Sequence, residues 1–588
     1  MKRNKIIYGM IAATTLFAAS CTDFDDYNEA YTDNNPQGTQ TLWDNISANG
    51  NLSQFAEILK KVNFDKELQN TRTYTVWAPA DGTYDVNELL SKYGNDNDLL
   101  KKFVNSHVAN YNYTLSGEVD ANVHALNGKS FALQGNGSNY TYDGVKITNP
   151  NLPNLNGILH TIDGYALFLP NIYEHIFDMN GYETDSIKNL FDRYENEYLD
   201  KSQSIEGGMD EEGNQTYIDS VMVVSNSLIN RDYLNANIIH EDSNFTMLIP
   251  NNDAFDKAYN QISKLYNYAA VTQYWEPSKA IPEPPTPSKE TTAEGFADSL
   301  TIRNIVANTV FNNNGYYNRW LVDPEYVNKS DTLYNTRNRK LSNGPEILSH
   351  TVGDVQKMSN GYVRVVDSLA YLPWETYNPE INVRLSTSNM PLVSGIQGTQ
   401  PTSRTLYLDE QGNITQSTSG KVRYTARYLD FVPADDYSNP KIYFNVSDVR
   451  STTYNVYVAL VPSDTIEGGV QRANKFEVAL SYADKNGNLS GSGSKLFTNS
   501  FNNWKKSVTT SKLVLSPDTI IKPDTILVGQ VTFPVSYYGL TNSKAMVRIS
   551  GNRSTWNTAE FAKIDNRIRL LGIILRPVEY DEYLKKDE

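Results

Sequence analysis

An internal repeat constrains the fold of this 588-residue chain more than any other feature of its sequence. The segment "NLNGILHTIDGYALFLP" at residues 154–170 has a partner in "MSNGYVRVVDSLAYLP" at residues 358–373. In each copy an Asn-Gly pair leads into an alternating apolar stretch that ends at an Asp, and this pattern is a strong local sign of a turn followed by a β-strand. The repeat predicts that the chain builds one structural unit twice.

A second pair of matching segments lies upstream of the first. "TYTVWAPADGTYD" at residues 73–85 matches "NFTMLIPNNDAFD" at residues 244–256. Each apolar strand stops at a proline, because proline has no N–H to give to a neighbouring strand. An Asp follows, Asp81 in one copy and Asp253 in the other, and a polar residue at this place can cap the next short helix.

Helical spacing of apolar residues follows in both copies. It occurs in "LLKKFVNSHVAN" at residues 99–110 and in "DSLTIRNIVANTVF" at residues 298–311. Each copy therefore predicts a strand, a proline stop, helices and a hairpin-rich end.

This order of elements resembles the fasciclin domain, whose motifs are matched in the first copy by "TVWAPADGTYD", by "SHVAN" with His107, and by "NGILHTID". The resemblance implies two fasciclin-like domains, at residues 40–171 and 172–384, with roles in adhesion and binding rather than catalysis. It also implies that His107 packs and hydrogen-bonds in the core and is neither a ligand nor a base.

The second copy diverges from the first in two ways. It has Thr309 or Val310 where the first has the histidine, and it is longer between its two motifs. The added length includes the proline-rich stretch at residues 276–290, which we expect to be extended and exposed.

The last two hundred residues have a different pattern. Residues 385–420 are rich in Ser, Thr, Gly and Gln, which predicts a linker or a long loop. Residues 421–588 contain seven or eight short, partly alternating segments with turn signals between them, which predicts a β-sandwich. The final strand "LLGIILRPVE" resembles the closing strand of jelly rolls. The predicted fold class is α+β, with two fasciclin-like domains before an all-β, jelly-roll-like sandwich.

The N-terminus carries the only cysteine of the chain. Residues 1–20 have a basic start, a short apolar core and small final residues, which is typical of a secretory signal. With Cys21 directly after it, the segment resembles a bacterial lipoprotein signal, which implies acyl chains on Cys21 and a membrane anchor. The alternative is an ordinary secretory signal with an incidental free thiol.

An acidic tether is predicted after the cysteine, at residues 21–39. Asp23, Asp25 and Asp26 resemble the acidic signal that sends lipoproteins of Bacteroidota to the outer face of the outer membrane. The alternative is a solvated acidic tether, and both can hold together.

Composition excludes several partners. The formal net charge is −16, and loss of Lys2, Arg3 and Lys5 with the signal takes it to −19. Such a charge disfavours nucleic acid and electrostatic docking on anionic lipid. No later segment has the length of about 20 apolar residues that a spanning helix needs, so we expect the mature chain to be soluble apart from its anchor.

No catalytic or metal-binding motif is present. The six histidines do not pair at zinc spacing, and phosphate-loop, nucleophile-elbow and His-Glu-x-x-His motifs are absent. We therefore predict no enzyme activity and no cofactor.

A tripeptide of Asp, then Ser or Thr, then an apolar residue recurs along the chain, and it resembles an O-glycosylation acceptor of exported Bacteroidota proteins. We expect sugar in exposed loops, notably at Ser299 and Thr332.

The sequence thus predicts a non-enzymatic lipoprotein on the cell exterior. Its predicted role is adhesion, or an accessory role beside a TonB-dependent nutrient importer of the SusC/SusD type. The main alternative is a glycan-binding protein whose sandwich presents flat aromatic rings to sugar. The candidate rings, for which core packing is the simpler explanation, are Trp504, Tyr537, Tyr538 and Trp556.

Overall fold

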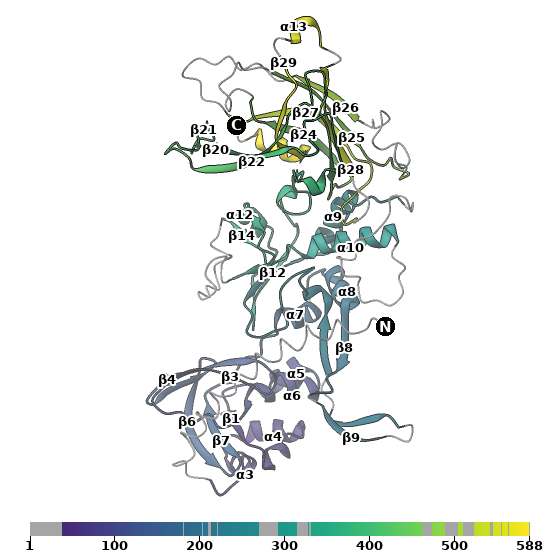
Figure 1. The fold of residues 1–588 in the computed structure, drawn as a ribbon. Coiled ribbons are helices and arrows are strands. Elements are labelled where there is room, and N and C mark those ends of the chain that lie inside the picture. The colour runs from purple at the N-terminus through teal and green to yellow at the C-terminus, as the bar shows by residue number, and fades with distance from the viewer. Residues whose placement is uncertain are drawn as a thin grey trace. The chain divides into compact units, whose positions relative to one another are not determined.

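The computed structural model of the chain describes residues 38–586 (Figure 1), except residues 180, 203, 210–212, 220–221, 270–291, 314–326, 328–330, 463–472, 488–503, 510–521, 541–544, 554–555 and 562–563. The predicted signal, Cys21, the three aspartates that follow it and the proline-rich stretch at residues 276–290 lie outside the described residues. The chain divides into two compact units, the first ending at Asn171 and the second beginning at Ile172.

The first unit is a seven-stranded sheet with helices packed against one face. The strand order is β2-β1-β7-β6-β5-β4-β3, in which only β1 and β7 run parallel. The strands are β1 (Tyr74–Pro79), β2 (Val108–Asn110), β3 (Glu118–His124), β4 (Ser130–Asn136), β5 (Asn139–Tyr142), β6 (Val145–Asn154) and β7 (Gly157–Ile162). The helices are α3 (Leu42–Ala48), α4 (Ser53–Lys61), α5 (Val86–Tyr93) and α6 (Asp96–Lys102), with short 3₁₀ turns η1 (Glu67–Gln69) and η2 (Val104–Ser106). A bridge between Ala109 and Ala125 joins the two edges, so the sheet closes on itself.

Strand β1 is buried on both faces, which explains its continuous apolar sequence. Tyr74, Val76 and Ala78 pack with the helices, whereas Trp77 lies in a second core on the opposite face. There the Trp77 ring stacks on Tyr142, with 4.3 Å between ring centroids.

His107 is fully buried in this unit. Its Nδ1 donates to the carbonyl oxygen of Phe103 at 2.8 Å, and its Nε2 accepts from the backbone N–H of Ala166 at 2.9 Å. Burial lowers the pKa of His107 to about 4, so the ring is neutral near pH 7. Both ring nitrogens are occupied inside the core, which is a structural role.

The second unit begins with a smaller sheet whose central strands repeat the pairing of β1 with β7. The strand order is β13-β12-β17-β16, and β12 and β17 run parallel. They pair from Phe245 with Gly361 to Pro250 with Val366, a register that matches β1 and β7 over six residues. The strands are β12 (Phe245–Pro250), β13 (Val310–Asn312), β16 (Gln356–Met358) and β17 (Gly361–Val366).

Helices and hairpins surround this smaller sheet. The helices are α7 (Ile172–Asp178), α8 (Asp185–Tyr194), α9 (Asn252–Ile262), α10 (Ala293–Val306) and α12 (Gly344–Ser349). Three hairpins are formed by β8 (Glu195–Leu199) with β11 (Met222–Asn226), β9 (Ile205–Met209) with β10 (Gln215–Asp219), and β14 (Leu333–Tyr334) with β15 (Lys340–Leu341). Thr309 holds the place of His107, because its carbonyl accepts from Leu248 as that of His107 accepts from Trp77.

The asparagine of each Asn-Gly pair performs the same task. Buried Asn156 accepts from the backbone N–H of Leu42 at 2.8 Å and donates to two carbonyl oxygens in the loop before β1. Buried Asn360 accepts from the backbone N–H of Ile172 at 2.9 Å and donates to two carbonyl oxygens before β12. Each side chain thus ties the first helix to the first parallel strand.

The glycine of each pair is required by a close backbone approach. Gly157 has φ +145° and Gly361 has φ +141°, a region that other residues rarely adopt. A Cβ atom would lie 1.8 Å from the carbonyl oxygen of Tyr74 at Gly157 and 1.9 Å from that of Phe245 at Gly361. The first position of each parallel pairing therefore requires glycine.

The polar residue after the proline caps a helix, but not always the one expected. Asp81 accepts from the backbone N–H of Ser53 at 3.0 Å, which caps the preceding helix α4. Its counterpart is Asn252, which accepts from the backbone N–H of Ser186 at 2.9 Å in α8. The next helix, α9, is capped by Asn251, which accepts from the backbone N–H of Ala254 at 2.9 Å, so the prediction of Asp253 as its cap is wrong. Asn252 is the second residue after its proline, as Asp81 is, and it takes the place of Asp81.

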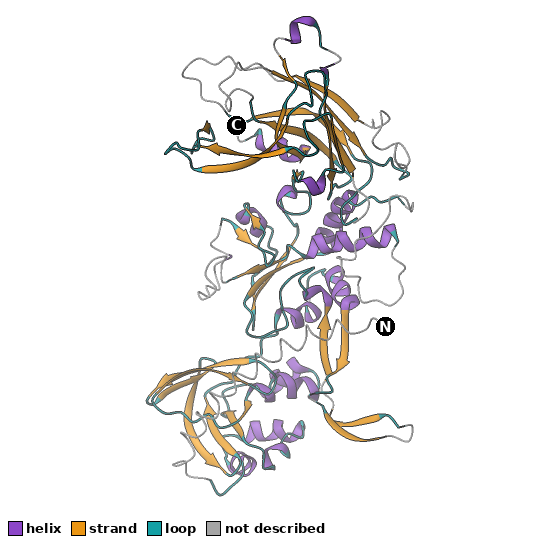
Figure 2. Cartoon of the chain, viewed as in Figure 1, coloured by secondary structure: helices purple, strands orange, loops and turns teal. Residues whose placement is uncertain are grey.

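Two further sheets make up most of the rest of the second unit, as the orange strands in Figure 2 show. One has the order β21-β20-β22-β30-β24-β27, with β18 also paired to β30, and the other β19-β23-β28-β25-β26, with β29 beside β25. The strands are β18 (Ile381–Asn382), β19 (Leu392–Ser394), β20 (Thr402–Leu408), β21 (Ile414–Thr415), β22 (Tyr424–Phe431), β23 (Lys441–Val446), β24 (Thr453–Leu460), β25 (Ala473–Ser481), β26 (Trp504–Thr509), β27 (Asp524–Thr532), β28 (Ala545–Gly551), β29 (Ile564–Asp565) and β30 (Ile568–Pro577). Apolar side chains of both sheets share one buried cluster.

Residues 385–420 are not a linker. They supply β19, β20 and β21, and β20 pairs with β22 along seven residues, from Thr402 with Asp430 to Leu408 with Tyr424. The first four residues of β20 are exposed, and only Leu406 is buried. An outer strand with both faces in water lacks the alternation that predicts a strand, so its polar sequence resembles a loop.

The smaller sheet and the two larger ones are joined by a continuous core. Residues of α9 and α10, including Ile262 and Leu300, lie in the same buried cluster as those of the larger sheets. Asn267 donates to the carbonyl oxygen of Pro534 at 2.8 Å and accepts from the backbone N–H of Ser536 at 2.8 Å. Among the described residues, no helix is both long and apolar enough to cross a membrane.

Candidate binding surface at the loop end of the C-terminal sheets

The four aromatic residues predicted to stack on sugar do not meet in one place. Tyr537 is 1% exposed, and its hydroxyl accepts from the backbone N–H of Ala483 at 2.7 Å. This corrects the prediction, because the alternation of its segment turns the ring into the core, where a sugar cannot reach it. Tyr538 is half-buried against Tyr266, with 5.7 Å between ring centroids. The side chain of Trp504 lies outside the described residues.

Trp556 belongs to an aromatic cluster in the loops at one end of the sheets. We call this cluster the rim; its members are Tyr437, Arg553, Trp556 and Phe561. The guanidinium carbon of Arg553 lies 5.1 Å from the ring centroid of Tyr437, 4.9 Å from that of Phe561 and 5.7 Å from that of Trp556. A guanidinium within about 6 Å of a ring is attracted by the ring's quadrupole, so Arg553 holds the three rings together.

The rim displays two of its rings to solvent. Tyr437 is 82% exposed and Phe561 43%, whereas Trp556 is 7% exposed and supports them from below. Sequence reasoning therefore found the buried member and missed the displayed ones. The available signal was the "ADDYSNP" turn at residues 434–440, where an aromatic ring stands among turn-forming residues.

A turn fixes Tyr437. The carboxylate of Asp435 accepts from the backbone N–H of Tyr437 at 2.8 Å. This hydrogen bond, with others from Ser438, lowers the pKa of Asp435, so the carboxylate that holds the turn stays charged.

A short capped helix, α13 (Thr558–Phe561), fixes Phe561. Asn557 accepts from the backbone N–H of Glu560 at 3.1 Å, and Glu560 accepts from that of Asn557 at 2.8 Å, which is a capping box. Glu560 also pairs with Lys475 of β25 at 2.9 Å, so the helix is tied to the sheet.

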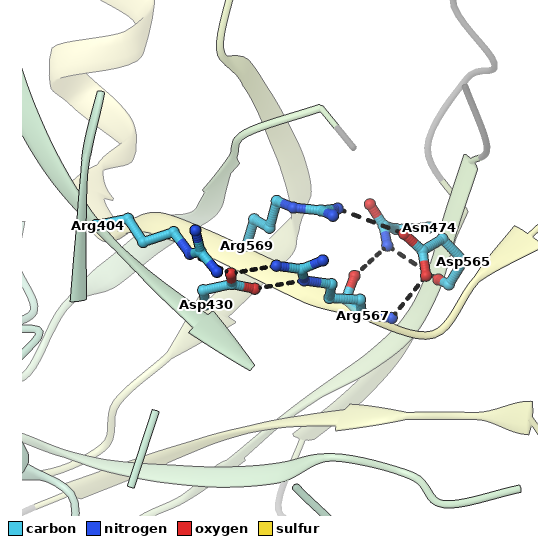
Figure 3. Close-up of polar contacts among 6 residues, drawn as sticks. All are labelled: Arg404, Asp430, Asn474, Asp565, Arg567 and Arg569. Carbon is cyan, nitrogen blue, oxygen red and sulfur yellow. Dashed lines mark hydrogen bonds and ion pairs between the residues drawn. The ribbon is translucent and has the colours of Figure 1, made fainter. Parts of the chain in front are cut away.

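A network of charged side chains surrounds the buried Asp430 (Figure 3). The side chain of Asp430 on β22 is fully buried. Arg567 binds it with two nitrogens, Nε at 2.7 Å and Nη2 at 2.5 Å, and the Nε of Arg404 binds it at 2.7 Å. Two arginines thus neutralise one buried carboxylate, and the bidentate pair fixes its direction.

The network continues to the rim through asparagines. Asn474 donates to the carbonyl oxygens of Asp565 at 2.9 Å and Arg567 at 2.8 Å, while Arg569 pairs with the Asp565 carboxylate at 3.3 Å. Asn566, in the same turn, donates to the carbonyl oxygen of Ser438, next to Tyr437. The buried charges therefore set the position of the loop that displays Tyr437.

This arrangement suits binding through flat rings. Exposed aromatic rings on fixed loops can stack on sugar rings or on apolar side chains, and the guanidinium between them adds hydrogen-bond donors. Both carboxylate oxygens of Asp430 are already bound by arginines. Among the described residues, no group of three or more His, Cys, Asp or Glu side chains is placed to hold a metal ion.

The first unit has a separate hollow of about 760 Å³. Its lining mixes polar and apolar side chains: Phe64, Glu67, Arg72, Thr73, Tyr74, Leu100, Asn105, Asn110, Tyr111 and Leu126. Tyr111 has a left-handed backbone with φ +71°, and the hydroxyl of Thr75 donates to its carbonyl oxygen at 2.7 Å. A bulky residue in this conformation marks a backbone held by its surroundings.

The two residues predicted to carry sugar are less exposed than expected. Ser299 lies in the middle of α10, half-buried, with its hydroxyl donating to the carbonyl oxygen of Gly295 at 2.9 Å. The prediction of an exposed loop is wrong for Ser299, because helical spacing continues through it. Thr332 lies in the bend before β14 and is half-buried.

One comparison identifies part of the chain. The sequence model of the fasciclin domain matches residues 50–167. Residues 50–167 are a fasciclin domain. They cover the sheet and helices of the first unit from Gly50 to Leu167, including His107 and the first Asn-Gly pair. Fasciclin domains are adhesion-type modules, so non-enzymatic binding is the activity expected of this part of the chain.

Solved structures give weaker likenesses. A FAS1 domain pair from the insect cell adhesion molecule fasciclin I matches with 12% identity and a TM-score of 0.19, over 56% of this chain and 99% of that one. A GH26-CBM35 β-(1,4)-mannanase of Podospora anserina matches with 14% identity and a TM-score of 0.14, over 32% of this chain and 28% of that one. A xanthan lyase of Paenibacillus matches with 9% identity and a TM-score of 0.18, over 39% of this chain and 18% of that one. These scores are too low to carry an argument, and no curated protein matches the chain.

Proposed function

We propose that the chain is a non-enzymatic adhesion lipoprotein, held on the outer face of the outer membrane by acyl chains on Cys21. The observation that carries the proposal is the fasciclin domain at residues 50–167. The basic and apolar N-terminal segment before Cys21, and the aspartates after it, support the anchor and the outward orientation.

We further propose that residues 172–384 include a second, diverged fasciclin domain and that the remaining sheets form a β-sandwich. The shared strand register, the paired Asn-Gly functions and the equivalent caps at Asp81 and Asn252 support the second domain. The buried cluster shared by the two larger sheets supports the sandwich. Adhesion modules in tandem, fixed to a membrane, would meet a partner at high effective concentration.

The anchor is tested by replacing Cys21 with Ser in cells that process lipoproteins. We expect the wild-type protein to enter the detergent phase on partitioning and to be cut by protease added to whole cells. Cys21→Ser is expected to remain in the aqueous phase, because two acyl chains supply the stable binding. Wild-type protein in the aqueous phase, or protected in whole cells but cut in lysed ones, would contradict the proposal.

The partner we propose is a TonB-dependent nutrient importer of the SusC/SusD type. The same detergent-solubilised membranes provide the test, by purification of the wild-type protein and identification of what remains bound. Recovery of an importer subunit with wild type, and its loss with Cys21→Ser, is the expected result. Recovery of the lipoprotein alone would exclude the importer as a partner and leave adhesion as the proposed function.

A second candidate function is glycan binding by the rim. It is favoured by one observation, the 82% exposure of Tyr437 beside Phe561 and Arg553. On a glycan array probed with the mature chain, we expect Tyr437→Ala and Phe561→Ala each to weaken binding about fivefold or more, since stacking on an aromatic ring contributes about 1–3 kcal/mol.

Tyr424→Ala is the matched control for this test. Tyr424 is 59% exposed at the start of β22, outside the rim, so its loss should leave glycan binding and the melting temperature unchanged. Equal weakening by all three variants, or no saccharide binding by the wild type, would exclude the rim as a glycan site.

A further inference from the structure

The hollow of about 760 Å³ lies within the first unit, between segments that are far apart in the sequence. The loop between α4 and β1 supplies Phe64, the end of β2 supplies Asn110, and Leu126 follows β3. The sheet fixes these walls, because Tyr74 of β1 pairs with Asn110 and the backbone N–H of Leu126 donates to the carbonyl oxygen of Val108 at 2.8 Å. The volume lies within the range of about 300–1,000 Å³ that small-molecule sites have. The hollow is therefore a preformed space that a small ligand can enter.

Tyr111 lines this hollow and is 56% exposed. Its backbone has φ +71°, a conformation that bulky residues rarely adopt. Asn110 and Asn112 flank it, and asparagine adopts this conformation several times more often. Folding alone would therefore favour asparagine at this position, and a tyrosine that stays largely in water adds little to the core. An exposed ring kept at an energetic cost indicates a use for the ring outside folding.

The sheet holds Tyr111 in this strained conformation. Its backbone N–H donates to the carbonyl oxygen of Thr73 at 3.2 Å, and its own carbonyl oxygen accepts from the hydroxyl of Thr75 at 2.7 Å. Both partners lie at the start of β1, beside the lining residue Tyr74, whose ring centroid is 6.3 Å from that of Phe64. The ring of Tyr111 thus extends from a fixed backbone over an aromatic wall.

The rest of the lining combines apolar and polar groups without a net charge. Five of its ten residues are apolar or aromatic, and the other five are polar or charged. The charged ones are a single carboxylate, Glu67, and a single guanidinium, Arg72, although the whole chain has a net charge of −16. A balanced lining gives no electrostatic attraction to an anion or a cation, so it favours a neutral ligand.

Asn105 adds an acceptor that is not in use. It lines the hollow from η2, and its side-chain oxygen Oδ1 is buried without a hydrogen-bond partner among the described residues. A buried acceptor without a donor is costly. Because the last torsion of an asparagine side chain turns freely, the amide can present this oxygen to a hydroxyl group in the hollow.

We propose that the hollow binds a neutral mono- or disaccharide, which stacks on Tyr111 and donates a hydroxyl hydrogen bond to Asn105. Sugar rings offer apolar C–H faces to aromatic rings and hydroxyl groups to amides, which is the combination that this lining provides. The balance of Glu67 and Arg72 sets the neutral class, and the volume sets the size. The site goes beyond the adhesion proposed for the fasciclin domain, and it depends on neither the anchor nor the rim.

The test is calorimetric titration of the mature chain with the neutral disaccharides cellobiose, maltose, lactose and mannobiose. We expect saturable binding of at least one of them at one site per chain. Tyr111→Asn and Asn105→Leu are each expected to weaken it about fivefold or more, since the first removes the stacking ring and the second the acceptor. No saturable binding by the wild type would overturn the site.

Two control variants locate the binding. Tyr424→Asn is the matched control, because Tyr424 is 59% exposed on β22 and its substitution removes an equally exposed ring elsewhere. It should leave the affinity unchanged, as should Tyr437→Ala in the rim. Equal affinity in Tyr111→Asn and Tyr424→Asn, or binding that is lost in Tyr437→Ala and kept in Tyr111→Asn, would overturn the hollow as the site.

Thermal unfolding without sugar separates binding from a purely structural role. We expect Tyr111→Asn to melt at the wild-type temperature or above, because asparagine relieves the strained backbone. Asn105→Leu is expected to do the same, because it removes a buried acceptor that has no donor. If both variants melt below the wild type, the two side chains are structural contacts and the proposal fails.

The neutral class of the ligand has its own measurement. We expect the affinity for the bound disaccharide to be the same at low and high ionic strength, because salt does not screen an uncharged ligand. We also expect digalacturonate, which carries carboxylates on a similar frame, to bind more weakly than the neutral disaccharide. Tighter binding of digalacturonate that weakens with salt would overturn the neutral class.

Discussion

Asp430→Asn is expected to reduce the free energy of unfolding of the second unit by about 3–5 kcal/mol. The fully buried Asp430 carboxylate neutralises Arg567 and Arg404, and its two oxygens accept from three arginine nitrogens. The asparagine amide would leave only one oxygen to accept from them. Its NH₂ group would face the donors of Arg567, which adds repulsion to the loss of charge. Removal of one partner from a buried pair leaves the other charge uncompensated, and this is the most costly type of polar substitution.

The measurement is urea unfolding of the mature chain, with hydrogen exchange as a second, local measurement. The peptides to compare come from β22, which contains Asp430, and from β30, which begins directly after Arg567. Arg404→Gln is the control. The Arg404 side chain is 42% exposed and supplies one of the three contacts, so its loss should cost no more than about 1 kcal/mol. A cost for Asp430→Asn as small as that for Arg404→Gln would mean that the network adds specificity to the loop end rather than stability.

The parallel strands at the centre of each fasciclin-like sheet could be predicted because single residues, a proline and a glycine, mark where they end and where they begin. Proline ends each strand since it lacks a donor, and glycine is required where a Cβ would meet a carbonyl oxygen at Gly157 and Gly361. Such local signals survive divergence, so the repeat remained visible although the second copy has Thr309 in place of His107. The error at Asp253 arose because three polar residues follow the proline, and each could serve as a cap. Only the three-dimensional contacts select Asn251 as the cap of the next helix, through Ala254, and Asn252 as the cap of the preceding one, through Ser186.

The candidate site was beyond sequence reasoning for a different reason. Asp430 and Arg567 are 137 positions apart, and nothing local at either residue indicates the other. The rim is formed by loops and by α13, whose rings only the folded chain brings together, and the turn-forming residues around Tyr437 were the one local signal for it. The strands within residues 385–420 were missed because β20 lies in water on most of its length, so burial imposes no period-two pattern on it.

Asn156→Ala and Asn360→Ala are each expected to cost about 3 kcal/mol or more in the unit that contains them. Each substitution leaves three backbone groups without partners: one N–H at the first helix and two carbonyl oxygens before the first parallel strand. A buried polar group left unsatisfied costs about 1–3 kcal/mol, so three of them outweigh any gain in side-chain freedom. Hydrogen exchange in peptides from β1 and β7, or from β12 and β17, measures the local loss.

Asn122→Ala is the control, since Asn122 is exposed on β3 and its loss should change stability by no more than about 0.5 kcal/mol. The comparison between the two buried asparagines carries the larger meaning. Because both side chains connect the start of a unit to its first parallel strand, a common fasciclin-type frame requires that both losses be large and that each stay within its own unit. A small effect at Asn360 beside a large one at Asn156 would mean that other contacts hold β12 in place, and the proposed second fasciclin domain would then lose its main physical support.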